Sequence, residues 1–488
     1  MILFFVAFLS GVMVGDIWGQ AGIWMIAFLV LIVSVFFWKN WKVFLGIILL
    51  LVVGYIMAIN ALQTLEKQRE NLGSRVGWEG HDRTISGIAR ELLSVSEFSH
   101  KYRVTVSNID AEILEHPLDI SVSMPPNLSL MPGDGVTAFG RFSFPRDTPE
   151  YQAEKQLSNR KIIAEFRSFS INKTPPEKYG IFVRMRTWFD QQLTEIFPPR
   201  GRDILSGIIL GQKNSLDAEL KEDLKASGLM HIMVVSGSNV MMLIIFLSLF
   251  LRSVTPWIRI VIITVTIGGF VLLVGGDTPV WRAALMGVIG YSASLWGYRF
   301  SALLLPLMVA VILAILNPLS LAYDIGLQLS FLSVICIISF GKQLTKFFSF
   351  LGAFFDEAMS LTVAATIGTF PITLFYFGSF SLIGPLANLL AAPAIPLLMY
   401  GGIATLLASA FSSSLAYMLG YIPWFAVTYL SEVISLFGSQ RWSLLPVELG
   451  QYREEFMIIS LGFLVLALVH FQKNHQSRLT SPGGSSSL

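Results

Sequence analysis

The residues in this sequence best suited to chemistry are polar side chains that interrupt long apolar stretches. The first cluster consists of His231, Ser236, Ser238 and Asn239, all within nine residues. Their imidazole, hydroxyl and amide groups predict either the polar lining of a water-filled path or hydrogen bonds between closely packed helices. The residue types alone leave both interpretations open.

A second cluster pairs Asp277 with Arg282. Thr278 and Pro279 between them are typical of a helix start, which places Arg282 about one turn inside the helix. A guanidinium group matches phosphate oxygens bidentately, so Arg282 is a candidate contact for a phosphate. The alternatives are an ion pair with Asp277 or Asp324, or a side chain that reaches the lipid headgroups.

Two further clusters lie towards the C-terminus. Gln328 and Ser330 enter an otherwise apolar stretch, and Asn388 follows the aromatic-rich segment 375–381. The polar groups are candidates for the same lining, with hydrogen bonds between helices as the alternative. The aromatic rings predict either a membrane-interface belt or faces on which nucleic-acid bases stack.

Several familiar chemistries are missing from the sequence. No two of the six histidines stand at metal-ligand spacing with carboxylate or cysteine support, so we expect no metal site. The chain contains neither the phosphate-binding GxxxxGK[ST] loop nor a GxSxG nucleophile motif. We therefore expect no cofactor and no enzymatic activity.

Composition indicates what positions these residues. Charged residues make up 14% of the 488 residues and hydrophobic residues 54%, with a mean hydropathy of +0.65; ordinary proteins carry about 25% charged residues. The charges are concentrated in 62–180, which holds 15 Lys and Arg and 16 Asp and Glu. We therefore predict an integral membrane protein with one inserted water-soluble domain.

The predicted fold is a polytopic α-helical membrane protein with about 12 transmembrane segments. Basic residues such as Lys39, Arg252 and Lys342 recur in alternate short loops, which predicts a cytoplasmic N-terminus, a cytoplasmic C-terminus and an extracytoplasmic 62–180. The segment 382–411 is too long for one crossing and contains three prolines, which predicts a broken span. The expected spans are 2–17, 21–37, 43–61, 232–251, 258–275, 279–297, 302–317, 324–341, 358–377, 382–411, 415–437 and 456–472.

The extracytoplasmic region reads as a small β-barrel, with an OB-like fold as one candidate. Five strands are expected, at 84–88, 102–106, 120–124, 136–142 and 161–166. Its net charge of −1 is unusual for a nucleic-acid module. A local basic face is the hypothesis, with a solvated surface as its alternative; the candidate residues are Arg141, Arg146, Lys155, Arg160 and Lys161.

The chain thus divides into five predicted parts. They are 1–61, with three transmembrane helices; 62–180, the β domain; 181–228, amphipathic helices at the membrane interface; 229–472, a transmembrane channel domain; and 473–488, a disordered cytoplasmic tail.

Four motifs together resemble the ComEC family of bacterial competence proteins. The segment 208–211 followed by 228–237 resembles its "LLxG…tGLxHLLaVSGlHv" signature, and 279–286 resembles "vvRAalM". Asn317-Pro318 with 324–331 resembles "nPl…dpGFQLSF", and 370–390 resembles "tlPl…fgrfSllgllaNll". The motifs follow in family order, and 133–157 resembles the family's OB-like outer module.

The resemblance implies a channel that carries single-stranded DNA through the bacterial cytoplasmic membrane during natural transformation. Bases would stack on aromatics such as Tyr102, Phe139, Phe142 or Phe144. By analogy, the partners besides the lipid bilayer are a membrane DNA receptor, a cytoplasmic helicase and a separate nuclease. The oligomeric state does not follow from the sequence.

Two departures from the family pattern bear on function. Asn239 stands where the signature has histidine, which puts any role for a histidine proton there in doubt. The HxHxDH motif of the family's metallo-β-lactamase-like domain is also missing, so we expect strand degradation by another protein. The rival hypothesis is a transporter of a lipid-linked or small polar solute whose outer domain is a scaffold.

Overall fold

The computed structural model describes residues 41–460 apart from 77–80, 97, 111, 145–156, 158, 213–215, 234, 277, 299–303, 441, 448–449, 453–454 and 458. The predicted spans at 2–17 and 21–37, most of 456–472, and the tail at 473–488 therefore lie outside the described residues. The chain forms two compact units. The first comprises 1–188 and 307–324, and the second comprises 189–306 and 325–488.

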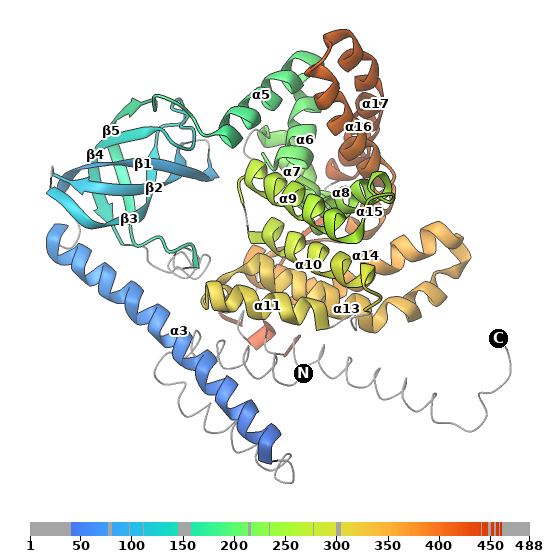
Figure 1. The fold of residues 1–488 in the computed structure, drawn as a ribbon, viewed down its shortest axis with the longest axis horizontal. Coiled ribbons are helices and arrows are strands. Elements are labelled where there is room, and N and C mark those ends of the chain that lie inside the picture. Colours follow the sequence, from blue (N-terminus) through green and yellow to red (C-terminus); the bar gives the residue numbers. More distant parts are fainter. Residues whose placement is uncertain are drawn as a thin grey trace. The chain divides into compact units, whose positions relative to one another are not determined.

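The first unit contains a closed five-stranded β-barrel (Figure 1). Its strands pair in the order β1-β2-β3-β5-β4, with β4 returning to β1, and all pairs are antiparallel except β3 with β5. The sequence therefore predicted a small barrel correctly. The strands are β1 (Asp82–Val95), β2 (His100–Ile109), β3 (Glu112–Met124), β4 (Gly135–Ser143) and β5 (Glu165–Thr174).

Alternation of apolar and polar residues explains why these segments form a barrel. Along β4, Val136, Ala138 and Phe142 are buried, whereas the residues between them point outward. A two-residue period places one set of side chains on each face of a strand. The inward set joins buried residues of the other strands, including Ile85, Val104, Ile120 and Phe166, to form one core.

The last strand begins later than the sequence predicted. We expected a strand at 161–166, but β5 begins at Glu165. Of the predicted range, only 165–166 belong to β5. Lys161 has a φ of 58°, in the left-handed region, and Ile162 and Ile163 are buried without being part of the sheet. An apolar run predicts burial, but it does not distinguish a strand from a buried connection.

One buried carboxylate ties β4 to the end of the domain. Asp134 is fully buried; Oδ1 accepts a hydrogen bond from the Tyr179 hydroxyl (2.7 Å), and Oδ2 accepts one from the Met131 amide (2.6 Å). The Lys173 ammonium lies 2.9 Å from Oδ2. Burial raises the pKa of Asp134, but these hydrogen bonds and the Lys173 charge outweigh it, so its pKa lies below the ordinary value.

Helix α3 and most of α11 belong to the same unit as the barrel. Helix α3 (Trp41–Val76) is one long helix (Figure 1), and Leu72 near its end packs into the barrel core. Helix α11 (Leu304–Leu316) leads into the short α12 (Ser320–Tyr323). Between α11 and α12, the Asn317 amide donates to the backbone carbonyl of Asn159 (2.8 Å).

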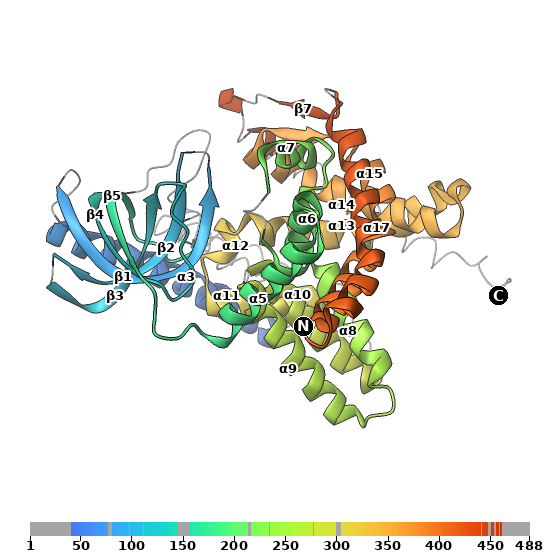
Figure 2. The same ribbon diagram turned by 90° about the horizontal axis from the view of Figure 1, so that it is seen from above.

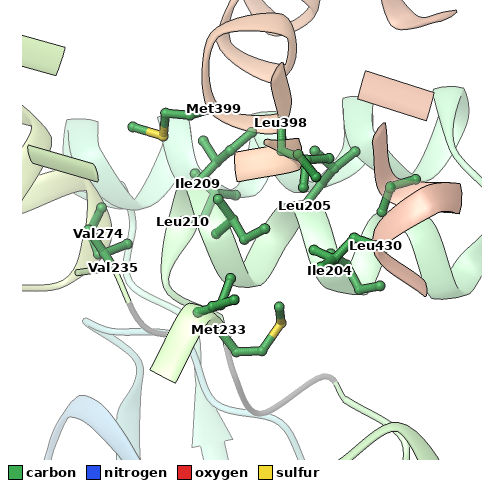
Figure 3. Close-up of a cluster of buried hydrophobic side chains, with 14 of the residues drawn as sticks. Ile204, Leu205, Ile209, Leu210, Met233, Val235, Val274, Leu398, Met399 and Leu430 are labelled. Carbon is green, nitrogen blue, oxygen red and sulfur yellow. The ribbon is translucent and has the colours of Figure 1, made fainter. Parts of the chain in front are cut away.

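The second unit is helical. Helix α6 lies in its centre, where Ile204, Leu205 and Ile209 are buried among residues of other helices (Figure 3). The helices are α5 (Ile181–Ile196, whose first half belongs to the first unit), α6 (Pro199–Leu210), α7 (Ala218–Ala226), α8 (Gly237–Phe250), α9 (Pro256–Val274), α10 (Thr278–Leu295), α13 (Ile325–Phe347), α14 (Ala353–Phe377), α15 (Gly384–Ala391), α16 (Ala394–Ser409) and α17 (Ser413–Gly438).

Small residues permit the close helix pairs in this unit. Helices α13 and α14 pack along each other (Figures 1 and 2), with Gly368 of α14 against the Leu332 carbonyl and Cys336 of α13. A Cβ on Gly368 would lie 2.6 Å from that carbonyl oxygen. Gly287 of α10 similarly receives the Ile244 side chain of α8. Interfaces of this kind are common between membrane helices.

Among the described residues, four helices are long and apolar enough to cross a membrane, and a bent pair of helices gives a fifth span if it counts as one. The pair, α15 and α16, is bent by 44°, which agrees with the broken span predicted at 382–411. Helix α8 has 14 residues, about 21 Å, and is shorter than a bilayer core of about 30 Å. A count of twelve therefore remains a prediction. The four single spans are 256–274, 325–347, 355–377 and 413–438.

The amphipathic segment predicted at 181–228 forms three helices. Of these, α6 is largely buried rather than half exposed, with eight of its residues from Gly201 to Leu210 inside the unit. The predicted location at a membrane interface and the five-part division of the chain remain predictions.

Candidate functional site

The first polar cluster lies at the start of α8. Ser236 precedes the helix with extended backbone (φ −93°, ψ 169°), and the Ser236 and Ser238 hydroxyls lie 2.6 Å apart. The Ser236 hydroxyl also donates to Asn239 Oδ1 (3.2 Å). Asn239 is buried, and its amide donates to the Ile208 carbonyl in the last turn of α6 (3.1 Å). Carbonyls at a helix end lack intrahelical partners, and Asn239 provides one here.

Gly211 allows α6 to end at this point. Its φ is 68°, and its amide donates to the Gly207 carbonyl, so it caps the helix in a left-handed conformation that glycine adopts without strain. Val235 and Val274 pack around the glycine, where an added Cβ would lie 2.9 Å from Val274 Cγ1. Figure 3 shows Leu210, Val235 and Val274 around this turn.

Arg282 is buried in α10, and its guanidinium donates to the Gly326 carbonyl in the first turn of α13 (2.9 Å). This contact joins two of the predicted motifs, because α13 also carries Gln328 and Ser330, both half-buried. A buried guanidinium that donates to a main-chain carbonyl in this way fixes α10 against the start of α13. Asp277 lies outside the described residues.

A third group connects the 228–231 turn with α15. The Nδ1 atom of the His231 ring lies 3.0 Å from the Gly228 carbonyl oxygen, within hydrogen-bonding distance. The Asn388 side chain lies within hydrogen-bonding reach of the same ring. The Asn388 amide donates to the Thr362 hydroxyl of α14 (2.9 Å). The His231 side chain is exposed at the surface of the unit. Two predicted lining residues, far apart in sequence, are thus neighbours.

Close backbone approach supports this neighbourhood. Gly228 has a φ of 74°, and a Cβ there would lie 2.9 Å from the Gly384 Cα. The Ser381 hydroxyl donates to the Ala226 carbonyl (2.7 Å). The signature segments at 228–231 and 381–388 therefore pack directly against each other.

These groups can hydrogen-bond, but they carry little net charge. The described residues contain no group of three or more His, Cys, Asp and Glu side chains able to hold a metal ion. The arrangement suits either a polar path or the anchoring of interrupted helices. The predicted absence of cofactors and of enzymatic activity remains a prediction.

The basic residues predicted on the outer domain are not gathered into one face by the contacts of the described residues. Arg141 pairs with Asp82 (2.9 Å), and Arg160 lies 3.8 Å from Glu91. Lys161 is exposed and forms no ion pair within the described part of the chain. Arg146 and Lys155 lie outside the described residues.

An exposed aromatic pair lies on the outer face of β4 and β5. The Phe139 and Phe169 rings are 44% and 54% exposed, with centroids 6.3 Å apart. Arg141 lies 6.0 Å from the Phe169 centroid, and exposed Arg167 is its cross-strand partner. We call Phe139, Phe169, Arg141 and Arg167 the aromatic patch.

The sequence missed Phe169 and Arg167. The predicted strand stopped at 166, whereas β5 continues to Thr174, and two-residue alternation from the buried Phe166 directs both residues outward. Conversely, Tyr102 and Phe142 are each 3% exposed, so the prediction that bases stack on them is wrong. The Tyr102 hydroxyl accepts from the Leu130 amide inside the barrel (3.2 Å), and Phe144 packs against the same core.

Comparison with known proteins places these features in a family. ComE operon protein 3 of Bacillus subtilis (strain 168) is 22% identical over 320 residues, which cover 64% of this chain but only 40% of that relative. No solved structure matches the chain. The model of the Competence protein family matches residues 208–473, which include the α8, α10, α13 and α15 motifs described above. This match covers more than half of the sequence, so the chain is a membrane protein that belongs to the Competence protein family.

Proposed function

We propose that this chain conducts single-stranded DNA across the cytoplasmic membrane during natural transformation. Membership of the Competence protein family supports a role in DNA uptake. The observation that supports single-stranded DNA as the transported form is the aromatic patch. In it, two exposed rings are flanked by two guanidinium groups. Rings stack on bases of any sequence, and arginines follow the phosphate backbone.

The barrel topology supports an OB-like assignment for the outer domain. In such barrels, the loops between β1 and β2 and between β4 and β5 take part in oligonucleotide binding. Here the second of these loops contains Arg146, Lys155, Arg160 and Lys161. Four of the predicted basic residues therefore belong to a loop that an OB-like barrel uses, whereas the aromatic patch lies on β4 and β5 rather than on the face of β2 and β3 that such barrels also use.

The helical unit would supply the path. His231 and Ser238 are exposed polar groups at the breaks that precede and begin α8, and interrupted backbone at membrane depth is tolerated where it lines a cavity. We place the barrel on the extracytoplasmic side and the C-terminus in the cytoplasm, because basic loops mark the cytoplasmic side. A DNA receptor, a cytoplasmic helicase and a separate nuclease are the partners in this scheme.

The decisive measurement is the fate of labelled duplex DNA in a deletion strain of the host, with surface-bound and internalised label scored separately. We expect surface binding to persist and internalisation to stop. Complementation with the Phe139→Ala/Phe169→Ala double variant should restore the protein but not full uptake. Each stacked base contributes about 1–3 kcal/mol, so purified double variant should bind oligodeoxythymidine at least about 30-fold more weakly.

Ile113→Ala is the matched control, because Ile113 is a large exposed side chain of the same barrel without a ring. It should bind and internalise DNA normally. Normal internalisation in the deletion strain would refute DNA conduction and favour a transporter of a lipid-linked or small polar solute. Unchanged oligonucleotide binding by the double variant would remove the aromatic patch from the proposal.

A further inference from the structure

A cavity of about 860 Å³ lies within the first unit, between α3, the barrel and the turn that follows α11. One face of α3 contributes polar side chains at a helical spacing, and the turn after α11 contributes Asn317 and Pro318. Its polar lining includes Thr64, Arg90, Arg103, Thr105, Asp119, Lys161 and Asn317.

The cavity wall has an excess of positive charge. The carboxylate among its described lining residues, Asp119, is bound by Arg103 and accepts a hydrogen bond from the Thr105 hydroxyl (2.6 Å). Arg90 donates from Nε to Thr105 (2.9 Å), but neither Arg90 nor Lys161 forms an ion pair within the described residues. Two cations that face one cavity and have no ion pair in the described part of the chain suit an anion such as a phosphate.

Asn317 adds an acceptor of fixed orientation. Its amide nitrogen donates to Asn159, which leaves Oδ1 facing the other way, buried and without a hydrogen-bond partner in the described part of the chain. A buried acceptor without a donor is costly, and a ligand hydroxyl would satisfy it. The ligand that fits both features carries a phosphate together with a hydroxyl group.

The backbone at Lys161 supports a ligand site. A residue with a side chain is uncommon at a φ of 58°, and such conformations persist where the surroundings or a function require them. Lys161 precedes the buried Ile162 and Ile163 in the chain, and its side chain lies at the cavity wall.

The position along the chain indicates where the ligand comes from. The α3 sequence is apolar from Val43 to Ile59 and becomes charged from Glu66, and the cavity wall begins at Asn60. Apolar α11 ends at Leu316, directly before Asn317. The apolar part of α3 and the whole of α11 thus end at the cavity, as expected at the level of lipid headgroups, where basic pockets bind anionic lipids.

We propose that this cavity binds the headgroup of an anionic phospholipid of the phosphatidylglycerol type. Arg90 and Lys161 bind its phosphate, and a glycerol hydroxyl donates to Asn317 Oδ1. Leu65, Leu118 and Ile163 provide apolar wall for the glycerol backbone. The site does not depend on DNA conduction, because it recognises a component of the membrane rather than the transported strand.

The test uses the purified full-length chain in detergent, with bound lipid counted by native mass spectrometry and affinity measured by titration. Phosphatidylglycerol should be retained in preference to phosphatidylcholine, which has the phosphate but no net charge and no hydroxyl donor. The Arg90→Gln/Lys161→Gln variant should bind phosphatidylglycerol about 25-fold more weakly, because each cation near a membrane surface contributes a factor of about five.

The matched control is Lys178→Gln/Arg184→Gln, which removes two exposed cations of the same unit outside the cavity and should bind lipid normally. Equal loss in both double variants, or none in the cavity variant, would overturn the proposal. Displacement of the lipid by millimolar inorganic phosphate would assign the site to a free ion, and displacement by an oligodeoxynucleotide would assign it to DNA. If the cavity variant does not fold, equal retention of the two lipids by the wild type would also refute it.

Discussion

Asp134 offers the sharpest test of how the barrel is stabilised. In Asp134→Asn, Oδ1 can still accept from Tyr179, but an amide NH₂ replaces the oxygen that accepts from Met131 and faces Lys173. The substitution leaves the Met131 amide without its acceptor, at a cost of about 1–3 kcal/mol. It also removes a charge-assisted contact of about 1.5–3 kcal/mol.

We expect a loss near the lower end of that sum, about 3 kcal/mol. The Lys173 side chain is 29% exposed and can turn towards water, whereas the Asp134 side chain is fully buried. At 1.4 kcal/mol per factor of ten, amides in β4 and β5 should exchange with solvent about 100-fold faster in the full-length variant. Hydrogen exchange measured by mass spectrometry on peptides from 131–144 and 165–174 reports this directly.

Asp82→Asn is the control, because it makes the same chemical change in a pair that is exposed. The Asp82 and Arg141 side chains are 41% and 50% exposed, and such pairs contribute at most about 1 kcal/mol. Exchange should then increase about fivefold or less. Similar exchange in the two variants would refute the role of Asp134.

The pH dependence has a defined sign. The pKa of Asp134 is lowered on folding, so its contribution is complete above the ordinary value of 3.8 and is lost as pH falls through the folded value. The hydrogen bond to Asp134 raises the pKa of Tyr179, whose contribution is complete below 10 and is lost as pH rises through the folded value. The difference between wild type and Asp134→Asn should therefore be constant from pH 5 to 8 and decrease at pH 3. A difference at pH 3 equal to that at pH 7 would contradict this account.

Two further substitutions test the helical unit. Gly368→Ala places a Cβ 2.6 Å from the Leu332 carbonyl oxygen, and overpacking of this kind should destabilise the chain by about 1–3 kcal/mol in thermal unfolding. The control is Gly341→Ala on α13, whose added Cβ meets nothing within 4 Å and should cause no such loss. Equal melting temperatures for the two variants would refute the close approach. Asn239→Leu leaves the Ile208 carbonyl without its hydrogen-bond donor, so we expect the free energy of unfolding to fall by about 1–3 kcal/mol. DNA uptake should then fall only in proportion to the amount of folded protein. Lost uptake at unchanged stability would instead make Asn239 a lining residue.

The barrel was predictable because its strands follow a local rule. The two-residue alternation in β4 specifies which side chains enter the core, and four of the five strands lie around their predicted positions. The aromatic patch was not predictable in the same way. Its Arg167 and Phe169 lie beyond 161–166, where the last strand was predicted, because an apolar run does not show where a buried connection ends and β5 begins.

For the contacts within the helical unit, the sequence predicts the donor residue but not its acceptor. The sequence singles out Arg282 as a costly group at membrane depth, but its acceptor, the Gly326 carbonyl, lies 44 residues away. Any main-chain carbonyl can accept such a bond, so residue types do not identify the partner. The bend between α15 and α16, by contrast, was predictable from local prolines.

The hydrogen-bond acceptors of these polar residues show which of the side chains remain able to bond to a transported strand. Asn239, Arg282 and Ser381 each donate to a main-chain carbonyl. A membrane protein must satisfy such carbonyls wherever a helix is interrupted, and this requirement explains these three residues without any solute. His231 and Ser238 are different, because both are exposed and bonded only to groups within three residues or to a neighbouring side chain. A path through this unit should therefore be sought first along His231 and Ser238, and the three anchoring residues should be assigned to the fold that holds the path open.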